Sequence, residues 1–461
     1  MEKIKVGLLP LYIKLYDDRG INRSLLEGFY QSIIEKLQGE GLEIIPAPIC
    51  RIEEEFVGAV KNFEENGAKA IITIHLAYSP SLESIDALCK TDLPIVVMDT
   101  TLDYSLSKEY SVDPISSNHG IHGVMDMCNL LKRRSKNYTV VAGHFENSNV
   151  LKNTVDCVKA SASAKALNGL KVGSFGGAFK GMGDFSISAK ELKDRLGVEL
   201  VEISNEEMLN AVNSITESQV ESELDYYKQN FTLLNENEEN NEALIASIKA
   251  CLATRKIIEE KGLGAYSANF LGIDKDNLGN MPFIEACLQM QKGVGYAGEG
   301  DVLTASFVGA LLKYISGVSF VEIFCPDWKE NRLLLSHMGE INFGLLRDKP
   351  KIATIPFPYT NSKTCTKPYA AFKEGNALYC NVFRAENEKL VLSVSKVKVT
   401  YVEGQVEDAV RGWITPNMNI AEFLEKLSEH GAIHHAFLVY DLDVKAMKCF
   451  GKTLNMEVVE I

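Results

Sequence analysis

Hydrophobic and polar positions in the first third of the chain alternate between two periods. Short apolar runs rich in β-branched residues are typical of buried strands, and they occur at residues 4–10, 42–46, 68–74, 94–98 and 138–142. Between them lie amphipathic segments such as residues 24–37, where one helix face is predicted to be buried by Leu25, Leu26, Phe29, Ile33 and Leu37. Strands that alternate with helices predict a parallel sheet covered by helices on both faces.

The same alternation begins again after a predicted helix at residues 154–167. A new strand is expected directly afterwards, and the pattern continues through a long helix at 242–261 and an apolar helix at 302–315. We therefore predict two doubly wound, Rossmann-like parallel α/β domains, residues 1–167 and 168–317.

The pattern changes near residue 318. A β-type run covers residues 318–324, and short strands with turn residues are predicted at 351–355, 377–384, 390–401 and 434–440, with one helix at 419–430. This part, residues 318–461, is predicted to be a mainly β, barrel-like C-terminal domain. The predicted fold class is thus α/β, with two doubly wound parallel-sheet domains followed by a barrel-like domain.

Charge and composition exclude several classes of partner. The net charge of −14 over 461 residues opposes binding to nucleic acid or to an anionic membrane, so we expect a protein that acts on small molecules. No apolar run approaches the ~18 residues of a membrane span, and the first apolar run, broken by Pro10 and Lys14, fits a strand better than a signal peptide. Ten scattered cysteines without paired spacing indicate reduced thiols in a cytoplasmic protein.

Residues suited to chemistry concentrate between residues 293 and 342. Glu299 lies in a glycine-dense turn before an apolar helix, Glu322 interrupts a β-type run, and His337 follows an apolar strand. Each also has a purely structural interpretation. Glu299 could accept hydrogen bonds from amides at the helix start, Glu322 could face water or be buried with a partner, and His337 could be a satisfied core histidine.

The histidine pairs and one glycine-rich segment are open to two interpretations each. His434 and His435 stand at the entry to a strand, where neighbours point to opposite faces, so at most one is expected to face a given site. His119 and His122 share one face of a predicted helix, as a site or as surface residues. The glycines of residues 172–184 match neither the dinucleotide fingerprint nor the Walker pattern, so no nucleotide is expected.

Taken together, these segments resemble the L-arabinose isomerase family. Gly-Tyr-Ala-Gly-Glu-Gly-Asp at 295–301 is similar to the family's glycine-rich glutamate motif, and Ser-Phe-Val-Glu at 319–322 to its Ser-Phe-Met-Glu. Ser-His-Met at 336–338 resembles the metal-binding Ala-His-Met, and Gly-Ala-Ile-His-His at 431–435 resembles Gly-Gly-x-His-His. The order of the motifs and their spacing agree over nearly the whole chain.

The resemblance implies a metal-dependent aldose–ketose isomerase. Glu299, Glu322, His337 and His435 would hold Mn²⁺, with Co²⁺, Mg²⁺ or Fe²⁺ as alternatives, and would leave about two octahedral positions for substrate oxygens. Glu299 and Glu322 would also be the acid–base pair that moves a proton between C1 and C2 through an ene-diol.

The resemblance further implies substrate contacts and an oligomer. Phe270 resembles a substrate-pocket phenylalanine, and His434 would contact the sugar. Asn-His-Gly at 118–120 resembles a family segment that carries a histidine, here His119, into a neighbouring subunit's active site. We therefore expect a homo-oligomer, a hexamer or another trimer-based assembly, with shared active sites.

Two segments depart from the family. After Glu322 the family reads Asp-Tyr-Thr-Tyr-His-Phe, whereas this chain has Ile-Phe-Cys-Pro-Asp-Trp, and the first strand ends in Leu-Leu-Pro-Leu-Tyr-Ile-Lys instead of Gly-Ser-Gln-His-Leu-Tyr-Gly. A retained metal site with an altered sugar pocket leaves L-arabinose, L-fucose, other pentoses and 6-deoxyhexoses as candidate substrates. Two other functions stay open: a non-catalytic sugar-binding or regulatory protein on the same scaffold, and a metal-dependent sugar epimerase.

Overall fold

The chain folds into two compact units. The computed structural model describes residues 3–19, 23–106, 114–235, 238–359, 364–403 and 412–461. The first unit comprises Met1–Ala164 and Lys445–Asn455, and the second comprises Lys165–Val444 and Met456–Ile461. The finer division into three domains, with boundaries near residues 167 and 317, stays a prediction. No helix of the described residues is long and apolar enough to cross a membrane.

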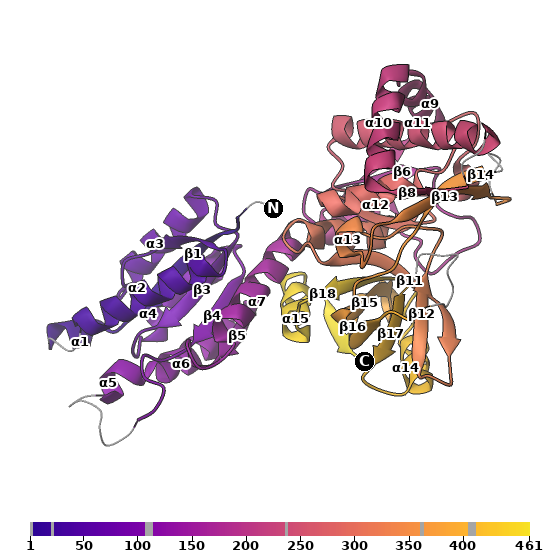
Figure 1. The fold of residues 1–461 in the computed structure, drawn as a ribbon. Helices are drawn as coiled ribbons and strands as arrows, with labels where there is room; N and C mark the ends of the chain where they lie inside the picture. The colour runs from indigo at the N-terminus through magenta and orange to yellow at the C-terminus, as the bar shows by residue number, and fades with distance from the viewer. Residues whose placement is uncertain (1–2, 20–22, 107–113, 236–237, 360–363, 404–411) are drawn as a thin grey trace. The chain divides into compact units, whose positions relative to one another are not determined.

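A five-stranded parallel sheet forms the centre of the first unit, in the order β2-β1-β3-β4-β5 (Figure 1). All five strands predicted for this region are present: β1 (Lys5–Leu11), β2 (Glu43–Pro46), β3 (Ala70–His75), β4 (Ile95–Asp99) and β5 (Tyr138–Ala142). The helices are α1 (Lys14–Asp18), α2 (Arg23–Gly39), α3 (Glu53–Glu65), α4 (Ser81–Lys90), α5 (Pro114–Asn118), α6 (Gly120–Arg133), α7 (Val150–Lys165) and α15 (Val444–Thr453).

One face of this sheet packs on α3, α4 and α6. Phe56, Ile85 and Met127 of these helices share a hydrophobic cluster with strand residues that include Leu9 and Ile71. Val6 and Leu8 point to the other face and are also buried, so both faces are covered.

The predicted apolar face of α2 needs one correction. Leu26, Phe29, Ile33 and Leu37 are buried as expected, whereas Leu25 is 46% exposed. A residue is turned by about 100° from its neighbour on a helix, so the position before Leu26 falls on the flank of the buried face.

The second unit begins with a four-stranded parallel sheet in the order β10-β9-β6-β7. Its strands are β6 (Lys171–Phe175), β7 (Glu199–Ile203), β9 (Ala265–Ala268) and β10 (Gly295–Gly298). The helices along this part of the chain are α8 (Ala189–Leu196), α9 (Asn205–Asn213), α10 (Glu217–Asn230), α11 (Glu238–Lys261), α12 (Phe283–Lys292), α13 (Val302–Leu312) and the short 3₁₀ helix η1 (Phe270–Gly272).

Helix α13 is buried along its whole length, as expected of a helix that is apolar on all sides. It packs on β9 and β10 of the parallel sheet and on three later strands, β11 (Val318–Asp327), β15 (Gly375–Arg384) and β18 (His435–Tyr440). Helix α13 therefore connects the parallel sheet with those strands.

The later strands close into a six-stranded antiparallel barrel, in the order β15-β18-β11-β12-β17-β16, where β16 pairs again with β15. The remaining members are β12 (Arg332–Ser336), β16 (Leu390–Thr400) and β17 (Gly412–Pro416), and β19 (Glu457–Glu460) adds in parallel to β16. Helix α14 (Ile420–Glu429) and the 3₁₀ helices η2 (Phe343–Leu345) and η3 (Glu386–Glu388) complete this region. The predicted fold class, two doubly wound parallel sheets and a barrel, is confirmed.

The predicted strand at 351–355 is present, but it lies outside the barrel. It corresponds to β13 (Lys351–Pro356), which pairs with β14 (Thr364–Tyr369) and, in parallel, with β8 (Thr232–Leu234). The barrel closes through β15 and β16, so β13 uses its backbone hydrogen bonds in a separate three-stranded sheet.

Candidate active site

Glu299 directly follows β10 and has a left-handed backbone, with φ of 62°. Such a conformation is strained for a residue other than glycine and is often found at functional sites. The amides at the start of α13 are capped by Asp301, whose Oδ1 accepts a hydrogen bond from Thr304 N at 2.9 Å. The helix-capping interpretation therefore applies to Asp301, and the Glu299 carboxylate points instead toward histidines.

The glycines around Glu299 allow a close approach of other groups. A Cβ on Gly298 would lie 2.7 Å from Cε1 of His337, and a Cβ on Gly300 would lie 2.4 Å from the carbonyl oxygen of Gly177. The glycine-dense turn is thus required by the packing of the site.

Three adjacent barrel strands bring the other predicted residues together. Glu322 on β11 stands opposite His435 on β18 and opposite Ser336 on β12, and His337 is the next residue after β12. All three of Glu322, His337 and His435 are buried.

The side-chain atoms of these residues converge. Glu322 Oε1 lies 3.0 Å from His337 Nε2 and 3.2 Å from His435 Nε2, and Glu299 Oε2 lies 3.5 Å from His435 Nε2. Despite this proximity, Glu322 Oε1 and His435 Nε2 are buried atoms that find no partner of hydrogen-bond geometry among the described residues. Such atoms cost about 1–3 kcal/mol each. A divalent cation would bind both, so the donor set fits a metal ion.

Two further carboxylates accept hydrogen bonds from the imidazole nitrogens that face away from the cluster. Glu340 Oε2 accepts a hydrogen bond from His337 Nδ1 at 2.7 Å, and Asp301 Oδ2 accepts one from His435 Nδ1 at 2.9 Å. Both arrangements leave Nε2 as the acceptor atom of the neutral imidazole, which is the form that a metal-binding histidine needs.

His434 also approaches the site, contrary to the expectation that only one of the adjacent histidines would. Its Nε2 lies 3.5 Å from Glu299 Oε2, and its Nδ1 lies 2.5 Å from Asp184 Oδ2. The strand β18 begins at His435, so His434 precedes it and the alternation of faces does not apply. Unlike His435, it is 39% exposed at its side chain.

The electrostatics follow from this mixture of carboxylates and imidazoles. Burial raises the pKa of Glu299, but the imidazoles of His434 and His435 outweigh it and lower that pKa to about 2. Burial lowers the pKa of His337, whereas Glu340 and Glu322 raise it to about 10. Because a bound metal ion would replace the proton on Nε2, the imidazoles would be neutral in the metal-bound site, and the carboxylates would supply its negative charge.

Three acidic residues of the site are absent from the set predicted from the sequence: Asp184, Asp301 and Glu340. Asp301 and Glu340 lie two and three residues from Glu299 and His337, and this proximity was the available signal. Asp184 ends the glycine-rich segment 172–184 and meets a histidine 250 positions away, for which the sequence has no local signal.

The other two predicted substrate contacts lie at different places. Phe270 packs against Phe179, with 5.6 Å between the ring centroids. The backbone amide of Phe179 in turn donates a hydrogen bond to the carbonyl oxygen of Glu299. His119 belongs to the first unit, where its Nε2 lies 2.6 Å from the hydroxyl of Tyr16 and its ring lies 5.5 Å from that of His122.

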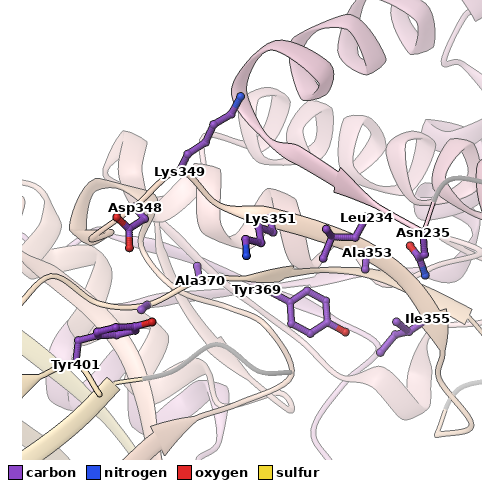
Figure 2. A pocket seen from close by; sticks show the side chains of 11 residues that line it. Leu234, Asn235, Asp348, Lys349, Lys351, Ala353, Ile355, Tyr369, Ala370 and Tyr401 are labelled. Atoms are coloured by element: carbon purple, nitrogen blue, oxygen red, sulfur yellow. The ribbon is translucent and has the colours of Figure 1, made fainter. Parts of the chain in front are cut away.

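A cavity of about 460 Å³ in the second unit is separate from this cluster (Figure 2). Tyr369 and Lys351 face it from paired positions on β14 and β13, and Asp348 and Tyr401 lie toward its other end. It contains none of the converging carboxylates and histidines, so it is not part of the candidate active site.

Comparisons with known proteins match two consecutive parts of the chain. The family model of the L-arabinose isomerase central domain matches residues 176–317, and that of the L-arabinose isomerase C-terminal domain matches residues 317–457. The L-arabinose isomerase of Actinobacillus succinogenes is 21% identical over 100% of this chain and 95% of its own. That of Shouchella clausii is 22% identical over 91% of this chain and 87% of its own. An ABC-transporter solute-binding protein from Actinobacillus succinogenes, solved with bound D-allose, is 12% identical over 68% of this chain and 89% of its own, with a TM-score of 0.17.

Proposed function

The chain belongs to the L-arabinose isomerase family as a divergent member, and from this premise we propose that it interconverts an aldose and a ketose with the help of a divalent metal ion. The observation that carries the proposal is the convergence of Glu299, Glu322, His337 and His435, in which buried donor atoms lack hydrogen-bond partners.

The proposed metal ligands are two carboxylates and two imidazoles. Glu299 and His435 also form a compact group with His434, whose ligand atoms lie within 4.8 Å of one another. We assign His337 rather than His434 as the second imidazole ligand. His337 is buried and hydrogen-bonded to Glu340, whereas His434 is partly exposed and bound to Asp184. Mixed oxygen and nitrogen donors suit Mn²⁺, with Co²⁺, Mg²⁺ and Fe²⁺ as alternatives. When bound, such an ion polarises the substrate carbonyl and stabilises negative charge on its oxygen.

The protein's own part in the reaction is proton transfer. The proton on C2 of the aldose is removed and added to C1, while the proton on the C2 hydroxyl is transferred to the C1 oxygen, which gives the ketose. An ionised carboxylate is needed to take the first proton, and the histidines beside Glu299 and Glu322 favour this form. These two glutamates are the proposed acid–base pair.

Substrate contacts are proposed for His434, Phe270 and His119. His434, partly exposed between Asp184 and Glu299, can hydrogen-bond a sugar hydroxyl. Phe270 packs close to the backbone of Glu299 through Phe179. For His119 the support is the Asn-His-Gly motif alone, and its role requires a homo-oligomer in which a neighbouring subunit supplies it.

The proposed substrate is a pentose or a 6-deoxyhexose. The relatives are named L-arabinose isomerases, and the segment Ile-Phe-Cys-Pro-Asp-Trp after Glu322 departs from the family motif that it resembles. Phe324 on this strand stands at an irregularity in the pairing of β11 with β12, half-exposed and 6.5 Å from the ring of His337. A bulge beside a site redirects a side chain, so this wall is expected to select the sugar.

The test measures metal content and isomerisation on one purified sample. Mn²⁺ is added, and L-arabinose, L-fucose, other pentoses and 6-deoxyhexoses are supplied in turn. We expect about one metal ion per chain and metal-dependent conversion of at least one sugar, both lost in the Glu299→Gln/Glu322→Gln double variant. The control Glu202→Gln removes an exposed carboxylate of β7 and should change neither.

The outcomes separate the two parts of the proposal. Stoichiometric metal without turnover of any sugar would leave the metal site standing and contradict the proposed activity. Absence of metal binding would contradict the four-residue site itself.

A further inference from the structure

The first unit contains a second cavity with an unusual lining. Its volume is about 980 Å³, at the upper end of the range typical of small-molecule sites. It is bordered by the end of α6, the start of β5 and α15, and it is lined by Lys132, Ser135, Lys136, Asn137, Tyr138, Thr139, Val140, Lys445, Lys448, Lys452 and Asn455. Five of these eleven residues are lysines, and none is an aspartate or glutamate.

Helix α15 presents three of the lysines. Lys445, Lys448 and Lys452 are spaced by three and four residues, which places them on one side of the helix. The opposite side is held in the core by Met447 and Phe450, both fully buried. Burial of the opposite side therefore keeps the lysine-bearing side of α15 facing the cavity.

Hydrogen bonds join the walls of the cavity. Asn137 Nδ2 donates to the carbonyl oxygen of Lys452 at 2.7 Å and to Asn455 Oδ1 at 2.6 Å, which ties the connection between α6 and β5 to the end of α15. Lys136 Nζ donates to the carbonyl oxygen of Thr91. The lining is thus organised before any ligand arrives, which reduces the entropy lost on binding.

The charge of this lining is opposite to that of the chain. Acidic residues outnumber basic ones, 62 to 48 in 461 residues, yet the charged residues that line this cavity are all lysines. A solvated helix face would explain the lysines of α15, and Lys132 suits the C-terminal turn of α6. Neither explains why lysines from α6, from α15 and from the connection between α6 and β5 line one cavity, where like charges repel. The cavity of Figure 2 differs in this respect, because Asp348 accompanies Lys349 and Lys351.

We propose that this cavity binds a small molecule that carries two or more phosphate groups. Lysine is a common phosphate ligand because its ammonium group is a compact charge with three donors. Ser135 adds a polar side chain to the same lining. A neutral sugar has no negative charge to offer to lysines, and a single phosphate would fill little of the volume. The site is separate from the metal cluster and does not depend on the proposed isomerase activity.

The probe is sodium tripolyphosphate, titrated calorimetrically into the full chain at low ionic strength without divalent metal, which polyphosphates chelate. Pyrophosphate, monophosphate and ATP are titrated in parallel. We expect about one tripolyphosphate per chain, weaker binding of pyrophosphate and monophosphate, and an affinity that falls as salt is added. ATP that binds tighter than tripolyphosphate would identify a nucleotide; equal affinities would show that phosphate charge alone is recognised.

The Lys445→Gln/Lys448→Gln/Lys452→Gln variant should bind tripolyphosphate at least about tenfold more weakly. The control Lys349→Gln/Lys351→Gln removes lysines at the cavity of Figure 2 and should bind as the unaltered chain does. Lys132→Gln on α6 provides an independent variant if the triple change lowers the melting temperature, and should weaken binding by a smaller factor.

Saturable binding that these α15 and α6 variants leave unchanged would overturn the proposal, as would the absence of saturable binding to the unaltered chain. A variant that changes sedimentation but not tripolyphosphate binding would also contradict it, and would show that this face contacts another copy of the chain. The assay uses neither sugar nor metal, so its failure is distinguishable from a failure of the isomerase proposal.

Discussion

The two carboxylate oxygens of Asp301 accept two different hydrogen bonds. Oδ1 caps α13 through Thr304 N, and Oδ2 accepts the hydrogen bond of His435 Nδ1. Any good N-cap side chain can make the first hydrogen bond. The second determines which nitrogen of His435 faces Glu299 and Glu322.

The Asp301→Asn variant should separate the effects of the two hydrogen bonds. Asparagine caps a helix as well as aspartate does, so the thermal stability of the metal-free protein should change little. Its amide would donate to His435 Nδ1 and leave the proton on Nε2, so the Mn²⁺ affinity should fall by about 10–100-fold. Calorimetric Mn²⁺ titration and thermal unfolding measure the two effects.

The matched variant is Asp301→Ala, which removes both interactions. It should lose metal affinity and about 1 kcal/mol of stability in addition. Unchanged Mn²⁺ affinity in the asparagine variant would show that His435 is not positioned through Asp301.

At the residue scale, the sequence predicts the converging glutamates and histidines because each belongs to a short motif. It does not predict Asp184, because that residue meets His434 only after the chain has folded. It also misjudges His434 itself, since the strand begins one residue later than predicted and the alternation of faces fails at that position.

At the element scale, the position of α13 depends on glycines that let its backbone lie close to the backbone of the parallel sheet. A Cβ on Gly309 would lie 2.5 Å from the carbonyl oxygen of Gly264, and a Cβ on Gly295 of β10 would lie 2.2 Å from Gly309 N. Carbonyl groups of the backbone cannot move aside as a flexible side chain can, so these glycines set the distance between helix and sheet.

The Gly309→Ala variant should therefore destabilise the second unit by about 1–3 kcal/mol, although alanine favours a helix. Gly28→Ala in α2 is the control, since nothing lies within 4 Å of its added Cβ, and it should raise stability by about 0.5–1 kcal/mol. Urea unfolding measures both. Equal effects of the two changes would refute the close-approach interpretation.

Arg255 joins three helices of the second unit. Its guanidinium on α11 lies 2.7 Å from Glu223 of α10 and 2.7 Å from Glu285 of α12, and the Glu285 side chain is fully buried. Removal of one partner from a buried pair leaves the other charge uncompensated.

Arg255→Met should accordingly cost about 3–5 kcal/mol in urea unfolding. The exposed pair Lys190–Asp194 on α8 provides the comparison, and Lys190→Met should change the free energy of unfolding far less than Arg255→Met does. If Arg255→Met costs as little as Lys190→Met, the three-helix network contributes no stability.

Strand positions could be predicted from periodicity, but not strand partners. The segment at 351–355 is a strand as predicted, yet its partners are β14 and β8, and β8 precedes it by more than a hundred residues. Periodicity reports which face of a strand is buried and contains no information about its neighbour in the sheet.

At the scale of the whole molecule, the proposed metal ligands come from different layers of the second unit. Glu299 follows the parallel sheet, whereas Glu322 and His435 belong to the barrel. A bound ion would link these parts, and a ligand that binds only the folded state stabilises it by mass action.

Mn²⁺ at about 100 times its dissociation constant should thus stabilise the second unit by about 2.7 kcal/mol relative to protein treated with a chelator. Differential scanning calorimetry should show the rise in the transition of that unit. The Glu322→Gln variant should show no Mn²⁺-dependent rise, and an equal rise in this variant would mean that the ion binds elsewhere.

The grouping of Lys445–Asn455 with the first unit is the part of the fold that the sequence indicates least. The sequence pattern predicts only one helix after residue 318, at 419–430, and assigns residues 318–461 to one domain, whereas α15 (Val444–Thr453) is grouped with residues 1–164. The hydrogen bonds from Asn137 to Lys452 and Asn455 belong to this grouping, and they form between residues more than three hundred positions apart.

This grouping has a consequence for how the protein is made. Met1–Ala164 emerges from the ribosome before Lys165–Val444 and Lys445–Asn455 have been synthesised, so the first unit cannot acquire α15 until the main part of the second unit has been made. Domains that are continuous in sequence can fold one after another during synthesis. Here α15 can join the first unit only after the intervening residues have been made, and a chain truncated before Lys445 would lack α15 and the side of the lysine cavity that α15 forms.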